Sequence, residues 1–516
     1  MRRSNLHFVP LLLLVTSAVA PPAAQQAPPP AGSPKALFHR REVMVPVRDG
    51  VRLETVILTP VDQQDALPIL FQRTPYGVPD QPPAPIPPSL KELAQDGYIF
   101  VLQNLRGRFK SEGVFHLSSW VDLSDPKATN ETTDAYDSID WLLKNVPNNN
   151  GKVGMFGVSY EGLTTALTLL HPHPALKAIS EQASPVDQWM NDDDHRYGAL
   201  RESYTFEYSV MEQADKDKNT HFPFDIYDTY EWYLELGPLS NINAKHLHGS
   251  IPYWNATVDH PDYDEFWKKE AWINQLHAST VPNLNVAGFA DQEDPWGPWQ
   301  IFRHAQENDP DHTNFMVAGP WYHGEWQSAK GDAIGILPFG GHETAREFRE
   351  TIEAPFFRYY LHGQGSKPGW QASTFQSGSN TWRTYALWPP PEAKPTKLYL
   401  HLDGTVSFSA PDMGTNRNPI PGICFRSRRS GAVSPAPHFS HLSWRRLAYL
   451  GSGRPALRRS PVRRALFRQR AARSRTHRHR SARGRSVRLY LRYRQRFCGE
   501  ADRRLSAEHT EERLET

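Results

Sequence analysis

Short apolar runs alternate with helical patterns along the first 320 residues of the chain. Each run is four to six residues long, which is typical of a buried strand, and several lead into polar or glycine-containing turns. Strands that alternate with helices predict an α/β fold with a mostly parallel sheet and helices on both faces. The apolar runs occupy residues 68–71, 98–102, 153–158, 284–289 and 315–318, and the helical patterns occupy residues 89–95, 133–145 and 160–170.

The pattern changes twice further along the chain. Between about residues 184 and 279, β-branched runs are few, aromatic, Asp and His residues are frequent, and residues 226–236 have a helical pattern. We interpret this segment as a helical insertion between two strands of the sheet, that is, a cap. From Thr374 onward, short alternating segments at residues 381–385 and 397–402 predict the start of an antiparallel β-sandwich.

The N-terminus has the pattern of an export signal. Two arginines at positions 2 and 3 precede an apolar run over residues 8–15 and the small-residue sequence Ala18-Val19-Ala20. The apolar run is shorter than the roughly 20 residues that a membrane span needs, which disfavours an anchor. Because Pro21 is unfavourable directly after a cleavage site, we expect cleavage a few residues later and a signal peptide over residues 1–24. A disordered leader is expected over residues 25–36. The export signal predicts a secreted or periplasmic protein.

Composition adds a second boundary, near residue 420. The 516 residues suffice for two or three domains, and both cysteines, Cys424 and Cys498, lie in the last hundred residues, so the preceding chain is not built around disulfides or a cysteine-ligated metal. Residues 1–420 carry a net charge near −17, whereas residues 421–516 contain 25 Arg, no Lys and 6 acidic residues, for a net charge near +19. A basic nucleic-acid-binding tail is one interpretation, but the complete lack of Lys argues against it.

The strongest chemical motif is Gly157-Val158-Ser159-Tyr160-Glu161-Gly162, which follows an apolar strand and precedes an apolar helix. A strand–turn–helix of this kind exposes a serine hydroxyl and leaves backbone N–H groups at a helix N-terminus for an oxyanion. The motif departs from Gly-x-Ser-x-Gly because Glu161 occupies the second glycine position and Gly162 comes one residue later. We identify Ser159 as the candidate nucleophile.

Two further residues complete a candidate triad. Asp291 ends the apolar run that starts at Leu284, and His323 follows the run at residues 315–318. A serine needs a base to take its proton, and the base needs an acid that fixes its tautomer. The order Ser, acid, His, with each residue beyond a strand, is that of an α/β-hydrolase.

Several stretches resemble the serine hydrolase family that contains bacterial cocaine esterase, X-Pro dipeptidyl-peptidases, glutaryl acylases and the α-amino-acid ester hydrolases (CocE/NonD type). The resemblance covers about residues 38–412 and implies an α/β-hydrolase domain with an inserted helical cap and a C-terminal β jelly roll. It also implies that the Tyr76 hydroxyl and the backbone N–H of Tyr160 form the oxyanion hole. The stretches are residues 73–76, 106–113, the Ser159 motif, the Asp291 and His323 segments, and residues 381–383.

Acidic residues near the triad resemble those of the α-amino-acid ester hydrolases. In that branch three carboxylates bind the α-ammonium group of the substrate, and they correspond here to Asp193, Glu293 and Asp294. At an effective dielectric constant near 20, one carboxylate about 4 Å from an ammonium contributes roughly 4 kcal/mol before desolvation. An acidic surface paired with Arg or Lys is the alternative, and the neighbouring Asp192 and Asp194 make Asp193 the less certain choice.

These features predict a serine hydrolase that transfers the acyl group of an α-amino-acid ester, or of a β-lactam side-chain amide, to water or an amine. We predict no cofactor, no metal, no nucleic-acid partner and no stable membrane anchor; the partner is a small substrate with a free α-amine, and homo-oligomerisation stays open. The alternatives are an X-Pro dipeptidyl-peptidase, another esterase of the family, or an inactive or carbohydrate-binding truncated hydrolase.

The expected domains are residues 37–183 with 280–366 (hydrolase), 184–279 (cap), 367–420 (start of the jelly roll) and 421–516 (Arg-rich tail).

The tail leads to a prediction about the gene. Residues 497–506 can be encoded so that skipping one base gives a segment that resembles a jelly-roll strand pair, so we interpret the tail as a shifted reading frame. A jelly roll without most of its strands exposes strand edges and an apolar face, so we expect the chain as written to be poorly soluble, with its tail cut rapidly by proteases. Restoring the frame around codons 415–425 should give a soluble, active enzyme. A monodisperse protein with a protease-resistant tail would contradict this interpretation.

Overall fold

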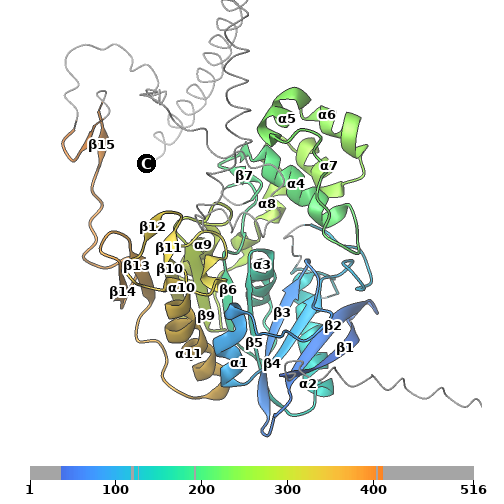
Figure 1. Cartoon of the computed structure of the whole chain (residues 1–516), viewed down its shortest axis with the longest axis vertical. Helices are drawn as coiled ribbons and strands as arrows, with labels where there is room; N and C mark the ends of the chain where they lie inside the picture. Colours follow the sequence, from blue (N-terminus) through green and yellow to red (C-terminus); the bar gives the residue numbers. More distant parts are fainter. Residues whose placement is uncertain are drawn as a thin grey trace, which may run out of the picture.

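The computed structural model describes residues 37–410, apart from residues 118–120, 122, 126, 191–192 and 402–404. The expected signal peptide, leader and Arg-rich tail lie outside these residues. A ten-stranded sheet in the order β1-β2-β4-β3-β5-β6-β9-β10-β13-β14 crosses the molecule (Figure 1). Its strands from β4 to β13 are parallel, and β1, β2 and β14 pair antiparallel with their neighbours. The strands are β1 (Phe38–Pro46), β2 (Arg52–Pro60), β3 (Leu67–Thr74), β4 (Ile99–Asn104), β5 (Asn149–Val158), β6 (Leu176–Gln182), β9 (Asn283–Gly288), β10 (Asn314–Gly319), β13 (Ala372–Gln376) and β14 (Thr381–Tyr385).

Helices cover both faces of the sheet, which is why its central strands are apolar on both sides. Met155 of β5 packs into a core with Leu142 and Leu163, whereas the next residue, Phe156, packs into a second core with Phe357. The first core includes residues of α2 (Glu131–Asn145), α3 (Tyr160–Leu167) and α9 (Gly297–Gln306), and the second includes residues of α1 (Lys91–Asp96), α10 (Thr344–Phe348) and α11 (Ala354–Phe357). Burial on both faces is characteristic of a parallel sheet in an α/β protein.

The structure confirms the predicted α/β-hydrolase fold. All five apolar runs are strands, and the three helical patterns correspond to α1, α2 and α3, with a short 3₁₀ turn before α1 and another after α3. The sequence did not predict β1, β2, β6 and β13 of the main sheet. The first of these is an edge strand with the sequence FHRREVMVP, whose charged residues hide the alternation of a strand but suit an exposed edge.

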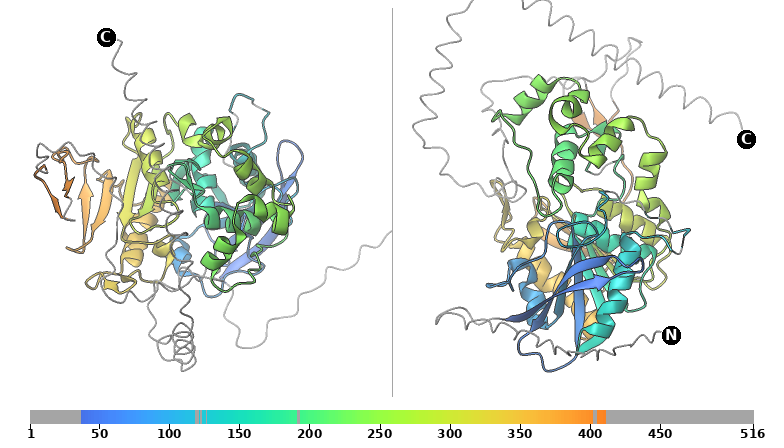
Figure 2. Two further views of the ribbon diagram at one scale, coloured as in Figure 1. Left: turned by 90° about the horizontal axis from the view of Figure 1, so that it is seen from above. Right: turned by 90° about the vertical axis from the view of Figure 1, so that its right-hand side faces the viewer.

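The chain between β6 and β9 forms the helical cap, which lies over the carboxyl ends of the parallel strands (Figures 1 and 2). Its aromatic core includes the fully buried Phe206 and Trp254, together with Trp232. The cap contains β7 (His195–Arg196), β8 (Ala199–Leu200), α4 (Glu202–Gln213), α5 (Thr229–Leu236), α6 (Ser240–Ile242), α7 (Pro252–Asp259) and α8 (Glu265–Glu270).

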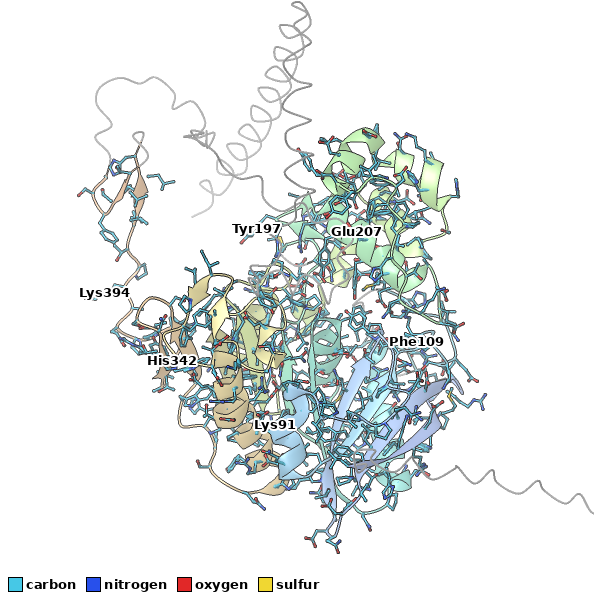
Figure 3. All side chains as sticks on the ribbon, in the orientation of Figure 1. Lys91, Phe109, Tyr197, Glu207, His342 and Lys394 are labelled. Atoms are coloured by element: carbon cyan, nitrogen blue, oxygen red, sulfur yellow. The ribbon has the colours of Figure 1, made fainter. Side chains whose placement is uncertain are left out.

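The motif at residues 106–113 joins the cap to the sheet. Phe109 lies at this junction (Figure 3), where its N–H donates to the Lys216 carbonyl at 2.8 Å. The buried Arg108 guanidinium donates to the Pro75 carbonyl at 3.0 Å and to the Glu212 and Asp215 carbonyls at 2.7 Å each. These bonds connect the turn after β3 to the end of α4, so the motif fixes the cap relative to the sheet.

The C-terminal part differs from the expected domain boundary at residue 366. Strand β13 pairs in parallel with β10, and β14 extends the same sheet, because the alternating segment at residues 381–385 completes a hairpin with β13. A separate two-stranded sheet follows, formed by β15 (Tyr399–Leu400) and β16 (Val406–Ser407). Of residues 367–420, the expected start of the jelly roll, residues 402–404 and 411–420 lie outside the described residues. None of the helices that the structure describes has the length and hydropathy of a membrane span.

Candidate active site

Ser159 lies at the tight turn between β5 and α3, on the side of the sheet that the cap covers. Its backbone is in the positive-φ region, with φ of +65° and ψ of −129°, a conformation that costs a non-glycine residue about 1–3 kcal/mol. Two hydrogen bonds hold it: the Ser159 N–H donates to the Gln182 carbonyl at 2.9 Å, and the Leu163 N–H donates to the Ser159 carbonyl at 2.8 Å. The turn therefore fixes the serine at the carboxyl end of β5.

Close packing around this turn explains its two glycines. A Cβ at Gly157 would lie 2.5 Å from the backbone of Glu161, and one at Gly162 would lie 2.5 Å from the Gln182 carbonyl oxygen. Neither neighbour is the end of a flexible side chain. The second glycine is needed at position 162 rather than 161 because position 162 is the one that faces β6.

The side chain of Gln182 is itself held from both ends. Its Oε1 accepts a hydrogen bond from the Trp326 indole N–H at 2.6 Å, and its Nε2 donates to Glu353 Oε1 at 2.7 Å. All three side chains are buried. The residue that anchors the Ser159 backbone is thus fixed by groups from two segments that follow β10.

Asp291 and His323 meet beyond the ends of β9 and β10. His323 Nδ1 lies 2.9 Å from Asp291 Oδ2 and 3.1 Å from Asp291 Oδ1. Asp291 Oδ1 also accepts from the backbone N–H groups of Glu293 at 2.7 Å and Asp294 at 3.1 Å. These bonds close the turn after Asp291, so the same carboxylate orients the imidazole and places the two acidic residues that follow it.

The charge of His323 is set by competing effects. Burial disfavours the imidazolium, but the negative charges of Asp291 and Glu293 outweigh this and raise the pKa of His323 to about 10. Glu293 Oε2 lies 3.5 Å from His323 Nε2, on the ring nitrogen opposite Asp291. His323 therefore lies between two carboxylates.

Asp193, Glu293 and Asp294 are all buried, and the charges of Asp193 and Glu293 act on this histidine. Burial raises the pKa of Asp193, and burial raises the pKa of Glu293 to about 7. The Tyr204 hydroxyl donates to Glu293 Oε2 at 3.0 Å, and Arg201 Nη1 lies 3.9 Å from Asp193 Oδ1.

In the part of the chain that the structure describes, no cluster of His, Cys, Asp and Glu has the arrangement of a metal site.

The neighbours of Asp193 have different surroundings. The Asp194 carboxylate accepts a hydrogen bond from the Tyr253 hydroxyl in the cap, and burial raises its pKa to about 7. Asp192 lies outside the described residues. Of the two described aspartates, Asp193 is the one whose charge acts on His323.

Tyr76 contacts the cap through Tyr208, and Tyr160 lines a small cavity at the start of α3. The Tyr76 hydroxyl lies 3.1 Å from the Tyr208 hydroxyl, and burial raises the pKa of Tyr76 well above its usual value, which keeps this hydroxyl neutral. Tyr160 is the first residue of α3, so its N–H points out of the helix N-terminus. This cavity has a volume of about 20 Å³, room for about one water molecule, and is lined by Leu117, Tyr160, Leu163, Pro185, Gln188, Asp193, Asp194, Tyr208 and Tyr253.

Comparison with known families agrees with this geometry. Residues 49–325, more than half of the chain, match the family described as X-Pro dipeptidyl-peptidase (S15 family). The chain belongs to the S15 family. The match starts before β2 and ends just after His323, so it includes all the predicted site residues.

Relatives of this S15 protein are esterases and peptidases. Cocaine esterase of Rhodococcus sp. (strain MB1 Bresler) is 28% identical over 431 residues, which are 81% of this chain and 71% of the esterase. A solved α-amino acid ester hydrolase is 33% identical with a TM-score of 0.69, over 76% of this chain and 67% of the other. An aminopeptidase from the marine sediment archaeon Thaumarchaeota archaeon is 35% identical with a TM-score of 0.68, over 75% of this chain and 65% of that one. The chain thus spans about two thirds of these two structures, and the matches support a hydrolase of the CocE/NonD type.

Sequence reasoning missed several residues around the S15 site. Gln182 gave no signal, because its partners Trp326 and Glu353 are 144 and 171 positions away. Tyr204 and Tyr208 lie one helical turn apart on α4, where aromatic residues are equally expected of a cap core. Their contacts with Glu293 and Tyr76 could be found only once the cap was placed over the sheet.

The packing at Gly162 leads to a prediction. Gly162→Ala should lower the free energy of unfolding by about 1–3 kcal/mol and reduce kcat, because the new Cβ displaces the Gln182 carbonyl that anchors Ser159. Urea unfolding and ester turnover measure the two effects. Gly369→Ala is the matched control, because no atom lies within 4 Å of a Cβ at that position. Wild-type stability and kcat in Gly162→Ala would show that the turn tolerates the displacement.

Proposed function

We propose that this S15 protein is a serine esterase that cleaves esters of α-amino acids with a free α-ammonium group, through an acyl-enzyme. The observation that carries the proposal is the burial of Asp193 and Glu293 beside His323. Burying carboxylates is costly unless a cation is present, and an α-ammonium placed near the reacting ester supplies one.

In this proposal Ser159 attacks the ester carbonyl, and His323 Nε2 accepts the hydroxyl proton. Asp291 fixes the tautomer by accepting from Nδ1, in agreement with the 2.9 Å contact. The oxygen that becomes negative is stabilised by the neutral Tyr76 hydroxyl and the Tyr160 N–H. The imidazolium then protonates the departing alcohol, which leaves an acyl-enzyme on Ser159.

The residues that line the small cavity beside Tyr160 offer contacts of two kinds to the acyl part of the substrate. Leu117, Leu163 and Pro185 form an apolar part, and Asp193 lies on the same pocket wall as the ammonium site. An α-amino acid branches at its α-carbon into a side chain and an ammonium, so the two regions match the two substituents. Water or an amine acceptor then takes the acyl group from Ser159, giving hydrolysis or acyl transfer.

An X-Pro dipeptidyl-peptidase is the second candidate, supported by the description of the family match. Such an enzyme also binds a free amine, so the acidic group serves either substrate. The two differ in the distance from the amine to the reacting carbonyl, which is one residue longer in a dipeptide. Turnover of an amino-acid methyl ester but not of an Ala-Pro anilide would support the esterase.

Removing the nucleophile tests the core of the mechanism. Ser159→Ala should lower ester turnover by at least about 10⁴-fold, because no other group in the proposal forms the acyl bond. Circular dichroism and thermal unfolding should match wild type, since the substitution removes only the side-chain hydroxyl and leaves the backbone hydrogen bonds of this turn in place. Substantial turnover by purified Ser159→Ala protein would refute the assignment, and stoichiometric fluorophosphonate labelling of Ser159 in wild type would exclude an inactive hydrolase.

Removing one charge tests the substrate class. Glu293→Gln should raise KM for phenylglycine methyl ester about tenfold or more, and raise KM for methyl phenylacetate, which lacks the amine, much less. The pKa of Glu293 is about 7, so lowering the pH through this value should also raise KM for the amine-bearing ester in wild type, since the carboxylate becomes neutral. Equal changes in KM for the two esters would mean that the acidic group is structural.

A further inference from the structure

Both ring nitrogens of His323 face carboxylates. Asp291 lies 2.9 Å from Nδ1, and Glu293 lies 3.5 Å from Nε2. Asp193 acts on the same ring from the cap, so the charged groups around His323 come from the loop after β9 and from the start of the cap. The surroundings of His323 therefore stabilise a doubly protonated ring, that is, an imidazolium.

An imidazolium cannot act as the base that the reaction needs. The lone pair on Nε2 must be available when the Ser159 hydroxyl transfers its proton, and in the imidazolium a proton occupies that position. The contact with Glu293 thus opposes catalysis in the substrate-free protein. Two hydrogen bonds hold the Glu293 carboxylate in this position: Gln292 Nε2 donates to Glu293 Oε1 at 2.8 Å, and the Tyr204 hydroxyl donates to Glu293 Oε2. Glu293 therefore does not move away from His323 by itself.

We propose that the α-ammonium of the substrate activates His323 by replacing the imidazolium as the cation that faces Glu293 and Asp193. This inference rests on the proposed function and deepens it, because it makes the amine a condition for forming the base as well as a handle for binding. The Nε2 proton of His323 passes to solvent when the ammonium binds, and the neutral Nε2 then accepts the Ser159 proton. One cation replaces another, so the net charge of the site stays the same.

The electrostatics agree with this exchange. The carboxylates raise the pKa of His323 to about 10, and burial raises the pKa of Glu293 to about 7. Between these values Glu293 is ionised and His323 is protonated in the substrate-free protein. A second cation next to Glu293 repels the imidazolium and lowers the pKa of His323, whereas an ester without the amine leaves it unchanged.

The experiment compares the pH dependence of kcat for phenylglycine methyl ester and methyl phenylacetate, because kcat reports the pKa of the base in the substrate complex. For the ester without the amine, kcat should rise with pH until about pH 10, the pKa of His323. For the amine-bearing ester the same rise should occur at a lower pH. Identical pH profiles for the two esters would overturn the proposal.

A cation supplied separately gives an independent measurement. Methylammonium is a cation at about pH 8, between the two pKa values, and is small enough to fill the ammonium site beside an ester that lacks the amine. Methylammonium chloride should raise kcat for methyl phenylacetate about tenfold at this pH, relative to sodium chloride of equal concentration. An equal effect of the two salts would count against the activation.

Substitution of Glu293 separates activation from binding. In Glu293→Gln the pH profile for methyl phenylacetate should move to lower pH, and the effect of methylammonium should disappear, because the carboxylate that holds the Nε2 proton is neutral. Glu207→Gln is the matched control: Glu207 (Figure 3) also has a pKa raised to about 7, but it contacts Tyr233 within the cap. This control should keep the wild-type profile and the wild-type response.

The outcomes distinguish the inference from the proposed function. If Glu293→Gln raises KM selectively for the amine-bearing ester but the pH profiles of the two esters coincide, amine recognition stands and activation fails. If KM is the same for both esters in wild type and in Glu293→Gln, amine recognition itself fails.

Discussion

The backbone of Ser159 is the constraint on which the site depends. A serine at positive φ is unfavourable by itself, and it persists because β5, α3 and β6 pack so closely that only glycine fits at positions 157 and 162. The anchoring carbonyl belongs to Gln182, whose side chain is held by Trp326 and Glu353. The sheet and the helices behind it therefore act together on one residue, and the rest of the fold positions other groups relative to it.

Electrostatics adds a second constraint. The site holds more than one buried carboxylate within reach of a single imidazole, and their pKa values are raised by burial. Such an arrangement is unfavourable unless a cation lies beside the carboxylates, and they raise the pKa of His323 to about 10, which favours its imidazolium form. The ionisation of His323 and that of the carboxylates around it are therefore linked.

Five strands of the parallel part of the sheet and three of its helices were predictable because local patterns carry them. Apolar runs mark β3, β4, β5, β9 and β10, and Asp291 and His323 each follow such a run. Non-local contacts were not predictable: Gln182, Tyr204 and Tyr208 act through residues that are distant in sequence or in the cap. The domain boundary at residue 366 was placed before β13 because residues 381–385 alternate as a sandwich strand would, although they form β14 and pair with β13 in the main sheet.

The cap enters the chain after β6 and leaves before β9, and it contributes Asp193, Tyr204 and Tyr208, whereas Ser159, Asp291, Glu293 and His323 belong to the sheet domain. The nucleophile and its base are therefore encoded by the sheet domain, whereas the acidic group beside them combines residues of both segments. A different cap grafted at the same two junctions would leave the nucleophile and its base unchanged while altering which acyl groups reach them. In this sense the scaffold is modular, and the inserted segment is where new specificities could be introduced.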